Sequence, residues 1–296
     1  MRRLDDSSVG TVGLAGVGVR RLGFGAMRVS GARNDNGERD RHEAIALCRR
    51  VYDRGVNFID AANIYGYGEC EEILSQAFSP YPSDLLIATK AGFRPGKLQP
   101  GQRSLPPLGR PEHIREECEK SLRRLRVDCI DLYQIHVPDP SVPYAETVGA
   151  FVELREAGKI RAIGVSNVDR SHLATAQSLC EVVSVQNAYN VGNRSSEDVL
   201  AACEHQGIVF IPHSPNILSG TPAEPVVAAV ASSHGVSSQQ VAVAWLLAHS
   251  TAAVPIPGTS KVGHADDNVD AAWLQLSEAE LLRLDACGAP PAPTGE

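Results

Sequence analysis

Residues 56–90, VNFIDAANIYGYGECEEILSQAFSPYPSDLLIATK, contain one complete strand–helix–strand unit. Val56–Asp60 and Leu85–Lys90 are short, mostly apolar runs typical of buried strands, and Glu69–Phe78 between them has the spacing of an amphipathic helix. Strands that alternate with helices pair in parallel, because the helix returns the chain to the same end of the sheet. The unit therefore predicts a parallel sheet covered on both faces.

The same alternation continues on both sides of this unit. Further strands are predicted at 21–24, 130–136, 162–167, 182–186, 208–211 and 253–256, and further helices at 40–54, 111–126, 145–157, 171–179, 196–206, 225–233, 238–248, 262–273 and 277–286. The chain of 296 residues then holds eight strand–helix units, and a (β/α)8 barrel typically needs roughly 250 residues. We predict an α/β fold, a (β/α)8 TIM barrel that forms a single domain over residues 1–296. An open, doubly wound sheet is the alternative, although it usually has fewer strands at this length.

The two ends of the chain are expected to lie outside the barrel wall. Gly13–Gly18 is glycine-rich, and we interpret it as the turn of an N-terminal β-hairpin, at about residues 1–19, that covers the floor of the barrel. Beyond the C-terminal helices, residues 288–296 are rich in Pro and Ala and are expected to form a flexible tail.

Composition narrows the class of protein. A net charge of −7 gives no basic patch for nucleic acid, and no run approaches the roughly 20 apolar residues of a membrane helix. The seven cysteines are odd in number and form no C-x-x-C pair, which predicts reduced thiols. No His/Cys cluster has the spacing of metal ligands. We expect a cytoplasmic protein without a metal, a membrane anchor or a nucleic-acid partner.

Polar residues stand at the ends of the predicted strands. In a (β/α)8 barrel all carboxyl ends of the strands open on one face, where the active site lies. Each residue alone could be a turn cap, a solvated charge or a satisfied core side chain. Together they predict one site, because buried charges are costly unless they are paired. The residues, in strand order, are Asp60, Lys90, His136, Ser166, Asn167, Gln186 and His213, followed by Gly258, Thr259, Ser260 and Lys261.

These positions coincide with a known pattern, because the chain resembles the aldo-keto reductases over nearly its whole length. The motifs are Leu22–Met27, Phe58–Gly66, Ile87–Lys90, Asp131–His136, Ile163–Asn167, Val185–Asn187 and Ile256–Ser260. The resemblance implies that Tyr65 is the general acid that protonates a carbonyl oxygen, that Lys90 favours its phenolate form, that Asp60 pairs with Lys90, and that His136 orients the substrate oxygen.

The resemblance also implies a nicotinamide cofactor. Ser166, Asn167 and Gln186 correspond to residues that bind its carboxamide, and Asn268 to one that contacts the adenine. Thr259, Ser260 and Lys261 precede a helix where phosphate binding is expected. His213 replaces the usual aromatic residue, and His264 stands where relatives often have an Arg. Because Lys261 and the hydroxyls could hold a 2′-phosphate, we expect NADPH, with NADH less favoured. Gly25, Met27, Ser214 and Gly258 complete the expected cofactor-binding set.

The sequence says less about the substrate than about the fold or the cofactor. Phe24, Phe93 and Tyr133 are candidate pocket walls. The layout is similar to a bacterial subgroup that contains pyridoxal reductases, so pyridoxal, a ketosugar or another small aldehyde or ketone is expected. Three other classes stay open: an NADPH-binding sensor or regulatory subunit with little turnover, a metal-dependent barrel hydrolase, and an inert structural barrel. The oligomeric state is not predicted.

Overall fold

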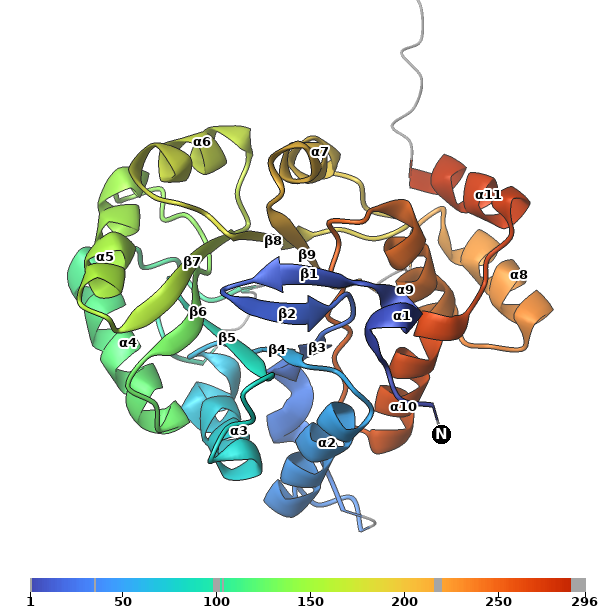
Figure 1. Cartoon of the computed structure of the whole chain (residues 1–296), viewed down its shortest axis with the longest axis horizontal. Helices are drawn as coiled ribbons and strands as arrows, with labels where there is room; N and C mark the ends of the chain where they lie inside the picture. Colours follow the sequence, from blue (N-terminus) through green and yellow to red (C-terminus); the bar gives the residue numbers. More distant parts are fainter. Residues whose placement is uncertain (1, 35, 98–101, 103, 216–219, 289–296) are drawn as a thin grey trace, which may run out of the picture.

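Seven parallel strands form the wall of a barrel. The computed structural model describes residues 2–34, 36–97, 102, 104–215 and 220–288. Its main sheet runs in sequence order with every neighbouring pair parallel, as Figure 1 shows at the centre of the molecule. The α/β barrel predicted from the alternation is thus confirmed. The strands are β3 (Phe24–Gly25), β4 (Phe58–Asp60), β5 (Leu86–Ala91), β6 (Ile130–Ile135), β7 (Ile160–Ser166), β8 (Ser184–Ala188) and β9 (Val209–His213).

The predicted eighth strand, 253–256, is not a regular strand. Ala253 makes a single parallel bridge to Phe210, and Val254 N–H donates to the Phe210 carbonyl at 2.8 Å. On the other side, Gly23 N–H donates to the Pro255 carbonyl at 2.9 Å. Pro255 and Pro257 have no N–H to donate, so the segment spans the gap between β9 and β3 without forming a full ladder. The first strand, predicted at 21–24, is likewise shorter and begins at Phe24.

Helices surround the sheet and follow the strands (Figure 1). Several begin where the sequence offers a cap: Asp40, Asp169 and Ser237 each accept hydrogen bonds from backbone N–H groups of the first turn, and Pro111 is the first residue of its helix. The predicted helix 262–273 ends earlier and continues as a 3₁₀ turn, Ala271–Trp273. The helices are α1 (Asp6–Val9), α2 (Arg41–Asp53), α3 (Glu69–Phe78), α4 (Pro111–Leu125), α5 (Tyr144–Glu156), α6 (Arg170–Leu179), α7 (Glu197–Gln206), α8 (Glu224–His234), α9 (Ser238–His249), α10 (Val262–Asp270) and α11 (Glu278–Gly288).

The predicted N-terminal hairpin closes one end of the barrel. Strands β1 (Thr11–Leu14) and β2 (Val17–Arg20) pair antiparallel, and they cross the barrel axis in Figure 1. Leu14 and Val19 are buried in one cluster with inward residues of the barrel strands, such as Phe58 and Leu132. A second, larger cluster fills the space between the strands and the helices. The hairpin therefore covers one end of the barrel, and the carboxyl ends of the strands lie at the opposite end.

Two further predictions concern membrane-spanning helices and the C-terminal tail. Within the described part of the chain, no helix is long and apolar enough to cross a membrane. The predicted flexible tail begins at Gly288, which is the last residue of α11; the rest of it, 289–296, lies outside the described residues.

Candidate active site

The predicted polar residues meet in one cavity at the carboxyl ends of the strands. Its volume is about 1050 Å³. The two-residue period of the strands places these side chains on the inner face, directly above the apolar residues of the floor. Residues of the predicted site that line the cavity are Gly25, Met27, Asp60, Tyr65, Phe93, His136, Ser166, Asn167, Gln186, His213, Ser214 and Gly258.

A buried ion pair lies at the base of this cavity. Lys90 Nζ is 2.6 Å from Asp60 Oδ2, and it also donates to the Ala61 carbonyl at 2.7 Å. Both side chains are almost completely buried. Burial lowers the pKa of Lys90, and the adjacent Asp60 carboxylate opposes this shift. Separating this pair would leave an uncompensated charge in the interior, which is costly.

Asp60 is held by two further donors. Oδ1 accepts from Gln134 Nε2 at 3.1 Å and from Gln186 Nε2 at 2.8 Å. Gln186 was predicted as a cofactor ligand, and here it also fixes the carboxylate. Gln134 is absent from the predicted site, although a signal existed: it lies two residues before His136 in the same strand, so both face the barrel interior.

Tyr65 lies above the ion pair, on the turn that follows β4. Lys90 Nζ is 5.2 Å from the centroid of its ring. The turn, Tyr65–Gly68, has left-handed backbone at Gly66, Tyr67 and Gly68, with φ of 58°, 59° and 93°. Tyr67 is the unusual residue of the three, because residues other than glycine rarely adopt a positive φ. This conformation turns the chain within four residues and leaves the Tyr65 ring facing the cavity.

Burial favours the protonated form of the Tyr65 phenol. Burial, and then the charge of Asp60, raise the pKa of Tyr65 well above its usual value near 10. The expectation that Lys90 favours the phenolate form concerns the loss of this proton during the reaction, and it stays a prediction.

Helix α4 packs against the Tyr65–Gly68 turn and the residues just before it. Asn63 Nδ2 donates to Glu117 Oε2 at 2.7 Å in the interior. Arg124, on the same helix, packs against Gly68 so closely that a Cβ there would lie 2.6 Å from Arg124 Cδ. Arg124 Nε in turn donates to the buried Glu71 at 2.6 Å. None of these five residues was predicted as a site residue, because their roles depend on helix packing.

His136 stands opposite Tyr65, and their ring centroids are 6.0 Å apart. Phe93 packs edge-on against the imidazole at 4.6 Å. Burial, with the charges of Lys90 and His213, lowers the pKa of His136 well below 6.5, so the ring is neutral. Its Nδ1 is buried without a hydrogen bond to any described residue. A neutral imidazole of this kind suits hydrogen bonding to a substrate oxygen.

The other side of the cavity carries amide and hydroxyl groups. Asn167 Nδ2 donates to the His136 carbonyl at 2.9 Å and lies 3.1 Å from Ser166 Oγ. Its Oδ1 is 3.1 Å from His213 Nε2, and His213 Nδ1 is 3.2 Å from Ser214 Oγ. Burial lowers the pKa of His213 to about 4. These residues form a connected wall of donors and acceptors.

The remaining predicted cofactor residues adjoin the cavity along the chain after Gly258. Lys261 precedes the first residue of α10, and no side chain caps this helix end; its N–H donates to Thr259 Oγ1 at 3.1 Å. Lys261 and His264 are exposed, Ser260 is half-buried, and Thr259 and Asn268 are buried. Glycine is required at 25 and 258, because a Cβ on either would collide with the backbone of the opposite segment.

Two of the three predicted pocket walls are wrong. Tyr133 does not line the cavity; it is fully buried and stacks on Phe151 at 4.9 Å, in the layer between the strands and the helices. It lies between Gln134 and Leu132, whose side chains point inward, so the strand period turns Tyr133 outward. Phe24 belongs to the same outer layer. Phe93 does line the cavity, with Ile64, Tyr67 and Leu105, which the sequence did not single out.

Comparison with known proteins identifies the class of this barrel. The Aldo/keto reductase family profile matches residues 21–289. The chain belongs to the aldo/keto reductase family. It is therefore an NAD(P)H-dependent oxidoreductase that acts on carbonyl groups. Among the described residues of this aldo/keto reductase, no group of three or more His, Cys, Asp or Glu side chains is placed to hold a metal ion.

Similar members of the family include two curated proteins and several solved structures. An uncharacterized oxidoreductase of Schizosaccharomyces pombe is 40% identical, covering 96% of this chain and 92% of that protein. The pyridoxine 4-dehydrogenase of Escherichia coli is 37% identical, covering 90% of this chain and 94% of that enzyme. An aldo-keto reductase of Klebsiella pneumoniae, solved with NADPH, is 25% identical with a TM-score of 0.78, covering 96% and 97%.

Proposed function

We propose that the protein reduces an aldehyde or ketone to an alcohol with NADPH, reversibly, and that Tyr65 is the general acid. One observation carries this proposal: the Asp60–Lys90 ion pair, with its 2.6 Å contact, lies beneath a neutral Tyr65 that faces a neutral His136 across one cavity. This arrangement provides a proton donor and an oxygen-positioning group on the same side of a bound carbonyl.

Different side chains have different roles in protonating the substrate oxygen. The substrate oxygen accepts a hydrogen bond from a ring nitrogen of His136 and takes the proton of the Tyr65 hydroxyl. As that proton leaves, negative charge develops on the phenol oxygen, and the Lys90 ammonium stabilises it electrostatically. Asp60 keeps the ammonium in place, with Gln134 and Gln186 fixing the carboxylate. A positioned general acid of this kind contributes roughly 10²–10⁴-fold to a rate.

The residues of the other wall fit a nicotinamide cofactor, which supplies the hydride when it is bound. Ser166, Asn167 and Gln186 offer the donors and acceptors that a carboxamide needs, and His213 presents a flat ring toward the same space. The uncapped amino end of α10 suits phosphate, because its backbone N–H groups have no side-chain partner. Lys261 at this end, with Thr259 and Ser260, favours NADPH over NADH.

The lining of the cavity supports a small carbonyl substrate with an apolar body. Ile64, Tyr67, Phe93 and Leu105 are apolar or aromatic. Pyridoxal is the first candidate, since a flat heteroaromatic aldehyde can pack against such side chains, and a relative is named as a pyridoxine 4-dehydrogenase. Ketosugars and other small carbonyls are the competing candidates.

The test begins with the cofactor. NADPH and NADH are titrated into the purified protein by fluorescence, and the loss of reduced-nicotinamide absorbance is then followed with a panel of carbonyls that includes pyridoxal. Tight NADPH binding with turnover supports the proposal. Binding without turnover on any carbonyl would favour a sensor or regulatory subunit, and no binding of either nucleotide would reject the assignment.

A further inference from the structure

The loop between β8 and α7, residues 189–196, contacts His213 and Ser214, which belong to the cavity wall proposed to bind the cofactor. The loop itself does not line the cavity. Asn190 Nδ2 donates to the Ser214 carbonyl at 3.0 Å, and Tyr189 N–H donates to the His213 carbonyl at 3.4 Å. Ser214 has a left-handed backbone, with φ of 56°, so its position depends on such contacts. The loop is therefore hydrogen-bonded to the backbone at both His213 and Ser214.

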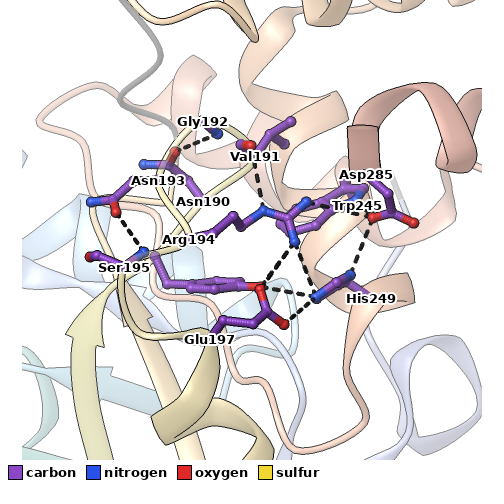
Figure 2. Close-up of polar contacts among 11 residues, drawn as sticks. Asn190, Val191, Gly192, Asn193, Arg194, Ser195, Glu197, Trp245, His249 and Asp285 are labelled. Carbon is purple, nitrogen blue, oxygen red and sulfur yellow. Dashed lines mark hydrogen bonds and ion pairs between the residues drawn. The ribbon is translucent and has the colours of Figure 1, made fainter. Parts of the chain in front are cut away.

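The outer side of this loop is anchored by Arg194 (Figure 2). Its guanidinium carbon lies 4.0 Å from the centroid of the Trp245 ring, on α9, and 5.5 Å from that of Tyr189. Arg194 Nη1 is 3.1 Å from Tyr189 Oη and 3.4 Å from Glu197 Oε2. Only 9% of the side chain is exposed. A planar guanidinium stacked and hydrogen-bonded in this way is much more rigid than a surface arginine.

Tyr189, Glu197 and Trp245 thus form one side of a cage around the Arg194 guanidinium. Asp285 of the C-terminal helix α11 forms the opposite side (Figure 2). Asp285 Oδ1 accepts from Trp245 Nε1 at 2.9 Å and lies 3.3 Å from His249 Nδ1 and 3.6 Å from Arg194 Nη2. Gly288, at the end of α11, is close enough that a Cβ there would lie 2.6 Å from the Val191 carbonyl oxygen. Thus a carboxylate and a backbone contact of α11 both hold the loop.

We propose that Arg194 and Asp285 are positioning residues for the nicotinamide cofactor. They fix the 189–196 loop, and the loop fixes Ser214 and His213 through Asn190 and Tyr189, so docking of α11 sets the affinity for the cofactor. This inference rests on the proposed use of His213 and Ser214 as cofactor-binding residues. It adds a role for the C-terminal helix, which contributes no residue to the cavity lining.

The experiment compares two cage variants with a control on the same helix. Arg194→Lys keeps the charge but loses the planar stack, and Asp285→Asn removes the carboxylate charge. Glu280→Gln is the matched control, because Glu280 pairs α11 with His234 of α8 at 2.9 Å, away from the loop. The dissociation constant of NADPH is measured for each folded variant, together with backbone amide exchange at 189–196 and at His213 and Ser214.

The expected result is NADPH binding weakened about tenfold in both cage variants, with faster exchange in these two segments, while Glu280→Gln stays within about twofold of the unmodified protein. Unchanged affinity in both cage variants would overturn the inference. An equal loss in Glu280→Gln would also overturn it, because the effect would then not be specific to the contact between Arg194 and Asp285. Should the unmodified protein bind no nicotinamide, the proposed function fails by itself, and exchange at His213 and Ser214 in Asp285→Asn still decides whether α11 holds these two residues in place. Arg194→Lys, the milder change, serves if Asp285→Asn does not fold.

Discussion

Gln186 donates a 2.8 Å hydrogen bond to Asp60, so a residue expected to contact the cofactor also orients the carboxylate that pairs with Lys90. The two halves of the site are therefore connected through one amide group. In a buried network each member constrains the others, and removal of one leaves its partners with unmet hydrogen bonds. The predictions below separate proton transfer, electrostatics, cofactor binding and positioning within this network.

Replacing Tyr65 by Phe removes the proposed proton donor and little else, because the aromatic ring stays. We expect the rate of carbonyl reduction to fall by roughly 10²–10⁴-fold, while the dissociation constant of NADPH changes little. Steady-state kinetics and a fluorescence titration measure the two quantities. Normal turnover in Tyr65→Phe would reject Tyr65 as the general acid.

Asp60→Asn leaves the Lys90 ammonium buried without its carboxylate, at the site of the 2.6 Å ion pair. Breaking a buried pair by removing one partner costs about 3–5 kcal/mol, so we expect a loss of that order in the free energy of unfolding, measured with urea. Lys90→Met should cost less, because Asp60 keeps the hydrogen bonds from Gln134 and Gln186. An Asp60→Asn variant as stable as the unmodified protein would contradict this electrostatic description.

His213 should make the protein less stable in acid. Its pKa is about 4 in the folded protein and about 6.5 when unfolded, so between these values the unfolded chain binds more protons. Stability is then complete above pH 6.5 and falls as the pH drops toward 4, by at most about 1.4 kcal/mol per pH unit. His213→Gln, which keeps hydrogen-bonding groups, should lose less stability between pH 7 and pH 4.5. Urea unfolding at both pH values is the measurement, and parallel losses in the two proteins would show that His213 does not contribute.

Lys261 is proposed to distinguish the two nicotinamide cofactors. Lys261→Ala should weaken NADPH binding much more than NADH binding, because only NADPH carries the 2′-phosphate. Conversely, His264→Arg should strengthen NADPH selectively, since a guanidinium binds phosphate through two hydrogen bonds. Both dissociation constants are measured for each variant. Equal losses for the two nucleotides in Lys261→Ala would remove Lys261 from the phosphate site.

Glu117 should affect catalysis although it lies outside the cavity. Glu117→Ala removes the acceptor that holds Asn63 behind the Tyr65 turn, and a displacement of about 1 Å can lower a rate by as much as roughly 10²-fold. Glu117→Gln keeps a carbonyl acceptor and should retain most of the activity. Arg115→Ala is the control. Arg115 lies on another face of α4, and this change breaks its exposed ion pair with Glu153 of α5. The readout is turnover at saturating NADPH. A loss of turnover in Arg115→Ala as large as in Glu117→Ala would indicate a general effect of α4.

The site could be predicted residue by residue where it depends on strand ends. Asp60, Lys90, His136 and Gln186 stand at the ends of short apolar runs, and parallel strands bring such ends to one face. Asn63, Glu117 and Arg194 could not be predicted, because the Asn63–Glu117 hydrogen bond and the contact of Arg194 with the Trp245 ring each join residues more than 50 positions apart in the sequence. The error at Tyr133 has another cause: its strand was correct, but the inward residues are its neighbours.

The sequence by itself determined the α/β alternation, the barrel and the set of polar groups on its rim, because hydrophobic periodicity and strand ends are local properties of the chain. Only the tertiary structure decided the burial of Tyr65 and His136, the second role of Gln186 and the contacts of α11 with the 189–196 loop. These features depend on burial and on charges brought together from distant segments. Desolvation and Coulomb interactions act through space, so the order of residues along the chain does not reveal them.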